Sequence, residues 1–144
     1  SATDRDYYMA RFYAPQARVV LGQTLQGVAS AAIDISDGLL ADLGHIARAS
    51  RVAAVVELSR LPLSIAMQRL DDRQAVESFA LAGGDDYELC FTARPDQHVH
   101  LAEFSELLDV KITEVGRILE GEGVSCIDSS GNTVPDAGSG YQHF

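Results

Sequence analysis

The stretch SAAIDISDGLLADL, residues 30–43, decides the fold, because polar side chains interrupt an otherwise apolar run. Asp34, Ser36 and Asp37 stand between the apolar segment Ala-Ala-Ile and the pair Leu-Leu. Polar groups that are buried without partners cost several kcal/mol. These three residues therefore either cap a helix or bind something charged.

The local pattern around these residues predicts a strand over 31–35 and a helix over 38–49. Alternate side chains of a strand share a face, so Asp34 and Ser36 point the same way, and Asp37 follows at the turn. Ser36 or Asp37 alone is most simply interpreted as a helix N-cap, but capping does not account for Asp34. Two carboxylates and a hydroxyl so close together form a partial ligand set for Mg²⁺. A helix N-terminus beside them also favours a phosphate.

A second acidic cluster lies in LAGGDDYELCF, residues 81–91. The pair Gly83-Gly84 permits a tight turn and a close approach of the backbone to a ligand. Asp85, Asp86 and Glu88 then gather negative charge at the start of a predicted strand. A solvated turn is the alternative interpretation, especially for Asp86 alone. The two glycines favour binding, either of a cationic substrate or of a further metal ion.

Weaker candidates have simpler explanations. His45 lies in the middle of a predicted helix without partner ligands, and it is interpreted as an ordinary core or surface histidine. The aromatic side chains of the first helix are interpreted as a packing surface rather than a base-stacking platform. Tyr141 is either a core residue or a stacking wall, and its spacing does not decide between them.

Composition limits the classes of protein and partner. The chain has 144 residues, 47% of them hydrophobic, which suits one folded domain. A net charge of −10, with Lys111 the single lysine, argues against nucleic acid and anionic membranes as partners. Such a domain would hold phosphates through divalent metal ions and backbone N–H groups. No apolar run approaches the roughly 18 residues of a membrane span.

The cysteines and the N-terminus indicate where the protein works. Cys90 and Cys126 lack the spacing of a metal site, and we interpret them as small buried side chains in a reducing cytoplasm. The first residues lack the basic and apolar order of a signal peptide. Because the chain starts at Ser1 without Met, we expect either a residue introduced by cloning or a piece of a longer protein.

Periodicity and turn residues predict the remaining elements. Helices are expected over 3–13, 17–28, 38–49, 64–70, 72–82 and 95–108. Strands are expected over 31–35, 52–58, 87–92, 112–119 and 123–127, with a short one near Thr133. Helices alternate with strands early and antiparallel pairs dominate late. This order predicts an α+β fold, a mixed sheet with packed helices in a three-layer α/β/α-like arrangement.

Several stretches together resemble the thiamine-monophosphate kinase family. They are AIDISDGLLADLGHIARAS (32–50), VVELSRLP (55–62), ALAGGDDYELCFT (80–92), VGRI (115–118) and GYQHF (140–144). The resemblance extends from about Tyr7 to the C-terminus. Each acidic motif alone is a weak signal, whereas the two in this order are fairly specific.

The resemblance implies an activity and residue roles. Members of the family transfer the γ-phosphoryl group of ATP to thiamine monophosphate, the last step of thiamine diphosphate biosynthesis, using several Mg²⁺ ions and no phosphoenzyme. Carried over by motif, Asp34 and Asp37 bind metal and Ser36 contacts ATP. Asp85 and Tyr141 contact the substrate, although many relatives have Glu in place of Asp85.

The resemblance also implies a domain organisation. Residues 1–144 correspond to a single domain, the C-terminal half of a two-domain kinase, with the fold of the C-terminal domain of the aminoimidazole ribonucleotide synthetase superfamily. An N-terminal domain, absent from this chain, supplies most ATP and Mg²⁺ ligands. The intact protein is expected to be a homodimer, and the chain alone an inactive monomer or weak dimer.

Two other functions fit the same residues. One is a free-standing module that binds a small phosphorylated ligand, and the other is a superfamily relative that acts on another phosphorylated substrate. The upstream sequence would test the first alternative, and phosphorylation assays with different acceptors would test the second.

Overall fold

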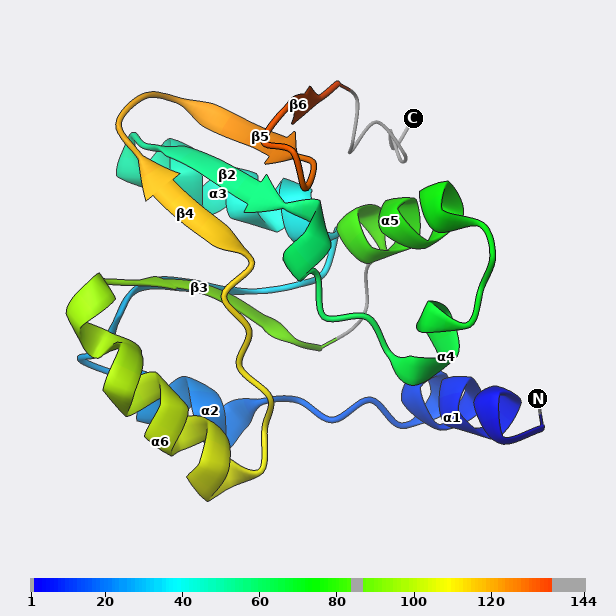
Figure 1. Ribbon diagram of the computed structural model, residues 1–144. Coiled ribbons are helices and arrows are strands. Elements are labelled where there is room, and N and C mark those ends of the chain that lie inside the picture. Colours follow the sequence, from blue (N-terminus) through cyan, green and yellow to red (C-terminus); the bar gives the residue numbers. More distant parts are fainter. Residues whose placement is uncertain (1, 84–86, 136–144) are drawn as a thin grey trace.

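The computed structural model describes residues 2–83 and 87–135, which form a mixed arrangement of helices and strands (Figure 1). The helices are α1 (Ala2–Tyr13), α2 (Val19–Thr24), α3 (Leu39–Ser50), α4 (Ile65–Gln68), α5 (Arg73–Ala82) and α6 (His98–Leu108), with short 3-10 helices at η1 (Leu58–Arg60) and η2 (Pro95–Gln97). The strands are β1 (Ala29–Asp34), β2 (Ala53–Glu57), β3 (Leu89–Ala93), β4 (Gly116–Leu119), β5 (Gly123–Ile127) and β6 (Thr133–Val134).

The strands divide into two sheets. The larger has the order β4-β2-β5-β6, in which β2 runs parallel to β5 and antiparallel to β4. The smaller is the antiparallel pair β1-β3. The predicted α+β class, with a mixed sheet and packed helices, is confirmed, although the sequence pattern did not indicate that β1 and β3 separate from the other strands.

Helix α3 connects the two sheets, because it contacts β2 and β5 of the larger sheet and β1 and β3 of the smaller one. The apolar residues on one face of α3, Leu39, Leu43, Ile46 and Ala47, recur at helical spacing and are almost completely buried. They form one core cluster with residues from both sheets and from α5: Leu39, Leu43, Ile46, Ala47, Ala54, Val56, Leu61, Leu81, Cys90 and Cys126. This packing fixes the beginning of α3 relative to the ends of β1 and β3.

Strand β1 is buried on one face only, although its apolar sequence suggested a buried strand. Ala31 and Ile33 are half-buried and pack against the core, whereas Ala32 and Asp34 are exposed. The alternation arises because successive side chains of a strand point to opposite faces. Asp34 therefore lies on the face of the smaller sheet that points away from the core.

Other boundaries shift for local reasons. The strand predicted over 112–119 begins only at Gly116, because β4 pairs with β2 and β2 turns into η1 after Glu57. The helix predicted over 17–28 is confined to α2. Among the described residues, no helix is long and apolar enough to cross a membrane.

Candidate functional site

The pairing of β1 with β3 brings together two acidic motifs that are about fifty residues apart in the sequence. Asp34, at the end of β1, lies opposite Leu89, at the start of β3. The backbone continues the contact, because the N–H of Ile35 donates to the carbonyl of Glu88 at 2.9 Å. Antiparallel pairing places the end of one strand beside the start of the other. Asp85, the predicted substrate residue, belongs to this second motif and lies outside the described residues.

A second contact, at Gly38, joins the same two regions. Gly38 is the N-cap of α3 and has φ of 110°, a conformation that suits glycine rather than other residues. A Cβ atom at Gly38 would lie 2.8 Å from the Cα atom of Ala82, the last residue of α5. The start of α3 therefore packs directly on the end of α5, next to Gly83.

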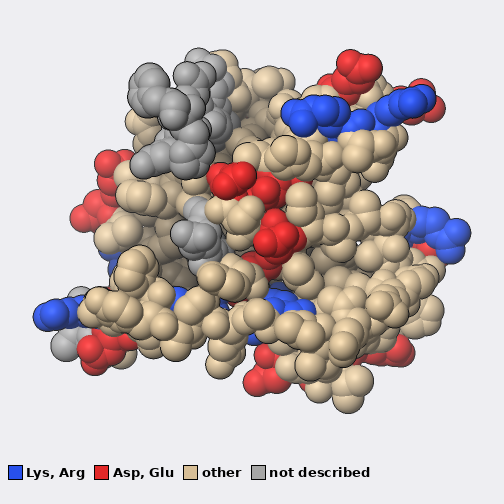
Figure 2. Space-filling view, turned by 180° about the vertical axis from the view of Figure 1, so that it is seen from behind, with Lys and Arg blue, Asp and Glu red and all other residues tan. Residues whose placement is uncertain are grey.

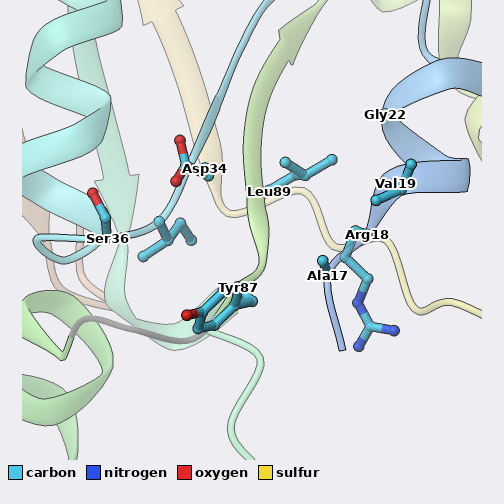
Figure 3. A pocket seen from close by; sticks show the side chains of 9 residues that line it. Ala17, Arg18, Val19, Gly22, Asp34, Ser36, Tyr87 and Leu89 are labelled. Carbon is cyan, nitrogen blue, oxygen red and sulfur yellow. The ribbon is translucent and has the colours of Figure 1, made fainter. Parts of the chain in front are cut away.

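A pocket of about 420 Å³ opens beside β1 (Figure 3). Asp34 and Ser36 lie on one side of it, and Arg18 and Val19 lie across from them (Figure 3). Tyr87 and Leu89 from the second motif also line the pocket, together with Ala17, Gly22 and Ile35. Two of the predicted site residues, Asp34 and Ser36, thus face one cavity.

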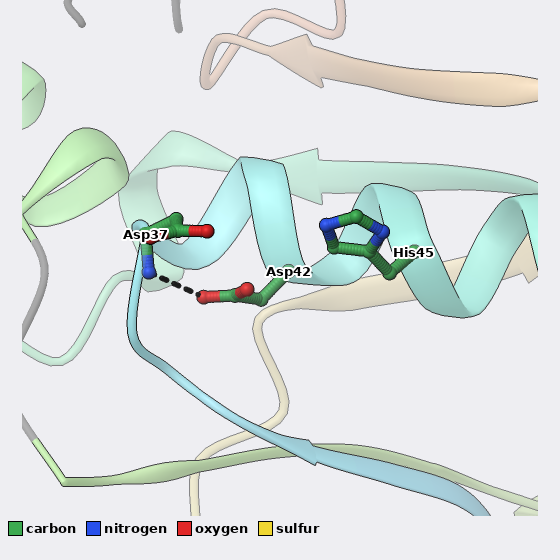
Figure 4. Close-up of side chains that lie close together, drawn as sticks. All are labelled: Asp37, Asp42 and His45. Carbon is green, nitrogen blue, oxygen red and sulfur yellow. Dashed lines mark hydrogen bonds between the residues drawn. The ribbon is translucent and has the colours of Figure 1, made fainter. Parts of the chain in front are cut away.

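Asp37 belongs to a different group of side chains, with Asp42 and His45 of α3 (Figure 4). One potential ligand atom from each of these residues lies within 4.8 Å of the others. Asp42 and His45 are three residues apart, so they share one face of the helix. The sequence interpretation missed Asp42 and treated His45 as having no partners, although this spacing was a signal that could have placed them together.

The capping interpretation of Ser36 and Asp37 is wrong. The N-cap is Gly38, and no side chain caps this end of α3. Instead, Asp42 reaches back from the first turn, and its Oδ2 accepts hydrogen bonds from the backbone N–H of Ser36 at 2.8 Å and of Asp37 at 3.0 Å. The side chains of Ser36 and Asp37 are therefore not used for capping.

The carboxylate of Glu88, in the second acidic cluster, is already paired with two arginines. Its carboxylate accepts hydrogen bonds from Arg11 at 2.6 Å and from two nitrogens of Arg18 at 2.8 Å. Burial disfavours the ionised form, but the hydrogen bonds from Arg18 and Arg11 outweigh it and hold the pKa of Glu88 below its ordinary value. The same hydrogen bond with Glu88 raises the pKa of Arg18. Glu88 thus anchors Arg18 at the edge of the pocket.

The oxygen atoms at this site are suitable ligands for a hard cation such as Mg²⁺. Asp34 and Asp37 are exposed carboxylates, which are the oxygen ligands that Mg²⁺ prefers. On one face of the molecule, one group of acidic side chains lies near the middle, and other acidic and most basic side chains lie toward the edge (Figure 2). Tyr141, the other predicted substrate residue, lies outside the described residues.

Comparison with known proteins identifies relatives of this chain. No protein-family model matches it. It is 42% identical over 153 residues to the thiamine-monophosphate kinase of Haemophilus influenzae, and the matched region covers 100% of this chain and 45% of that protein. It is 38% identical to the thiamine-monophosphate kinase of Escherichia coli, over 99% of this chain and 44% of that protein. The chain thus spans less than half the length of these curated relatives.

Solved structures agree with the sequence comparison. The thiamine-monophosphate kinase from Stenotrophomonas maltophilia superposes with a TM-score of 0.84 at 47% identity, covering 92% of this chain and 41% of that one. AaThiL complexed with AMPPCP and TMP superposes with a TM-score of 0.76 at 33% identity, covering 98% and 42%. E. coli HypE, a hydrogenase maturation protein, has a TM-score of 0.66 at 21% identity, covers 83% and 39%, and shares the fold alone. The chain is therefore a homologue of the thiamine-monophosphate kinases over about 44% of their length.

Proposed function

We propose that this chain is the C-terminal half of a two-domain kinase that transfers the γ-phosphoryl group of ATP to thiamine monophosphate. The observation that carries the proposal is the pairing of β1 with β3, which sets Asp34 of the first acidic motif beside Glu88 and Leu89 of the second. The complex of the similar AaThiL with AMPPCP and TMP supports an ATP-dependent reaction on this substrate. The product would be thiamine diphosphate.

The roles of the residues follow from the family resemblance, and their positions are compatible with it. Ser36 would contact ATP and Asp34 would bind metal, and both residues line the same pocket. Asp37 would bind a separate ion, since it lies with Asp42 and His45 and is not among the residues lining that pocket. Bound Mg²⁺ would neutralise the charge of the phosphates, which is what phosphoryl transfer chiefly requires besides positioning.

Asp85 and Tyr141 would contact the thiamine moiety. The thiamine ring system carries a positive charge, which a carboxylate attracts, and an aromatic side chain can pack on its face. Both residues lie outside the described part of the chain, so their roles depend on the motifs that contain them. Glu88 takes no part in this contact, because its carboxylate is bound to Arg11 and Arg18.

The intact protein would have an N-terminal domain that supplies most of the nucleotide site, and it would act as a homodimer. It would work in the cytoplasm. Cys90 and Cys126 support that location, because both thiols are free and buried in the core.

A phosphorylation assay tests the proposal directly. The intact protein, given ATP, Mg²⁺ and thiamine monophosphate, should form thiamine diphosphate, and it should not phosphorylate other phosphorylated acceptors at a comparable rate. The 144-residue chain alone should form no product above a control without protein. A preference for another acceptor would favour a different superfamily activity, and ligand binding without phosphorylation would favour a binding module.

A further inference from the structure

We propose that Asp42 is a positioning residue, which holds the backbone of Ser36 and Asp37 so that their side chains meet ATP and metal. This role rests on the proposed kinase function, because it assigns a task to Asp42 within that same site. The juxtaposition that suggests it is a single buried carboxylate oxygen bonded to two consecutive residues of the site.

Burying the carboxylate of Asp42 costs free energy unless hydrogen-bond partners replace its water. In the described part of the chain Asp42 is the one charged residue that is buried, with 2% of its surface exposed. A buried carboxylate loses its hydration, and hydrogen bonds must replace it. The N–H groups of Ser36 and Asp37 provide this replacement, and the N-terminal end of α3 adds a favourable dipole.

Asp42 is held in place by the first turn of α3 and by the core packing of that helix. It lies in the first turn of α3, and its own N–H donates to the carbonyl of Gly38 at 3.0 Å. Leu39, Ile46 and Ala47 of the same helix are buried in the core cluster that joins α3 to both sheets. Asp42 therefore fixes the backbone of Ser36 and Asp37, in the segment between β1 and α3, relative to the core.

The orientation of these two residues matters because they serve different parts of the site. Ser36 lines the pocket with Asp34, whereas Asp37 lies with Asp42 and His45 (Figures 3 and 4). A rotation of the backbone between them would move both side chains at once. Partners that orient metal ligands typically contribute 10–100-fold to metal affinity or activity.

Two kinds of substitution separate positioning from simple stability. Asp42→Leu and Asp42→Ala remove the acceptor oxygen, and the leucine also fills the buried space. Asp42→Asn keeps one oxygen that can accept both N–H groups while it removes the charge. In the intact protein we expect the leucine or alanine variant to lose about 10–100-fold in kcat and to need more Mg²⁺ for half-maximal activity. The asparagine variant should recover at least about tenfold of that loss.

Two matched controls accompany them. Asp72→Ala removes another hydrogen bond between a carboxylate and a backbone N–H, the 3.0 Å bond to Ala75 at the start of α5. Leu43→Ala removes core packing from the same helix without touching the Asp42 contacts. At a temperature where circular dichroism shows each variant folded, both controls should keep the Mg²⁺ requirement and the kcat of the unsubstituted protein.

A measurement on the 144-residue chain is independent of activity. The amide protons of Ser36 and Asp37 should exchange with solvent at least about tenfold faster in the Asp42→Leu or Asp42→Ala variant than in Asp72→Ala. Unchanged exchange would overturn the inference, as would an unchanged Mg²⁺ requirement and kcat in the acceptor-free variants. An equal shift in Leu43→Ala would also overturn it. Inactivity of the unsubstituted intact protein toward thiamine monophosphate would refute the proposed function, and the positioning role with it.

Discussion

Replacing Gly38 by alanine should separate the start of α3 from the end of α5 at a large cost in stability. The backbone at Gly38 has φ of 110°, where a side chain adds strain of about 1–3 kcal/mol. The new Cβ would also lie 2.8 Å from the Cα atom, 2.9 Å from the carbonyl carbon of Ala82 and 3.0 Å from the carbonyl oxygen of Leu81. These are backbone atoms, so relief requires a shift of α5, and overpacking of this kind costs about 1–3 kcal/mol.

The two contributions add to about 2–6 kcal/mol, a large part of the 5–15 kcal/mol that typically stabilises a domain. Two glycines provide controls for urea denaturation of the chain followed by circular dichroism. Gly27 has φ of 81° and nothing within 4 Å of a new Cβ, so Gly27→Ala should show about 1–2 kcal/mol of backbone strain without the clash.

Gly44, inside α3, is the opposite control. Its new Cβ would meet only ordinary contact, with Cγ2 of Val124 at 3.9 Å, so Gly44→Ala should stabilise the chain by about 0.5–1 kcal/mol. A loss for Gly38→Ala no larger than that for Gly27→Ala would refute the inferred contact between α3 and α5.

Three further predictions concern charge. In the intact protein, Asp34→Asn should lower turnover at least about a hundredfold and raise the Mg²⁺ requirement, and near-normal turnover at low Mg²⁺ would mean that Asp34 is structural. The pKa of Glu88 is lowered on folding, so the stability that Glu88 contributes is complete above its pKa in the unfolded chain. This stability is lost as the pH falls through the pKa of Glu88 in the folded chain. Replacing Glu88 by glutamine should therefore make the urea midpoint depend less on pH in the acid range. Burial, and then the charge of Asp42, raise the pKa of Cys90 to about 11, so stability should fall as the pH rises from the unfolded thiol pKa toward 11. The same fall in a Cys90→Ala variant would contradict that assignment.

The local sequence determined most of the elements of this protein. Apolar periodicity placed α3, α5 and α6 within a few residues of their observed bounds, because burial of one helix face leaves a regular pattern. Strand β5 was predicted with its observed bounds, Gly123–Ile127, because glycine-containing turns mark both ends. Spacing alone grouped Asp34, Ser36 and Asp37 as a partial Mg²⁺ ligand set, and the family resemblance supplied the expected role of each residue.

The tertiary structure decided how those residues are divided and held. Periodicity reports that a face is buried, but it does not specify which partner covers it, so the pairing of β1 with β3 and the burial of Asp42 were not predicted. Glu88 was interpreted as a binding acid, because its two arginine partners lie 70 and 77 residues away in the sequence. The separation of Asp37 from the pocket of Asp34 and Ser36 likewise follows from backbone direction after β1, which α3 sets through Asp42. Contacts between segments that are distant in the sequence create these features, so a local pattern of residue types does not predict them.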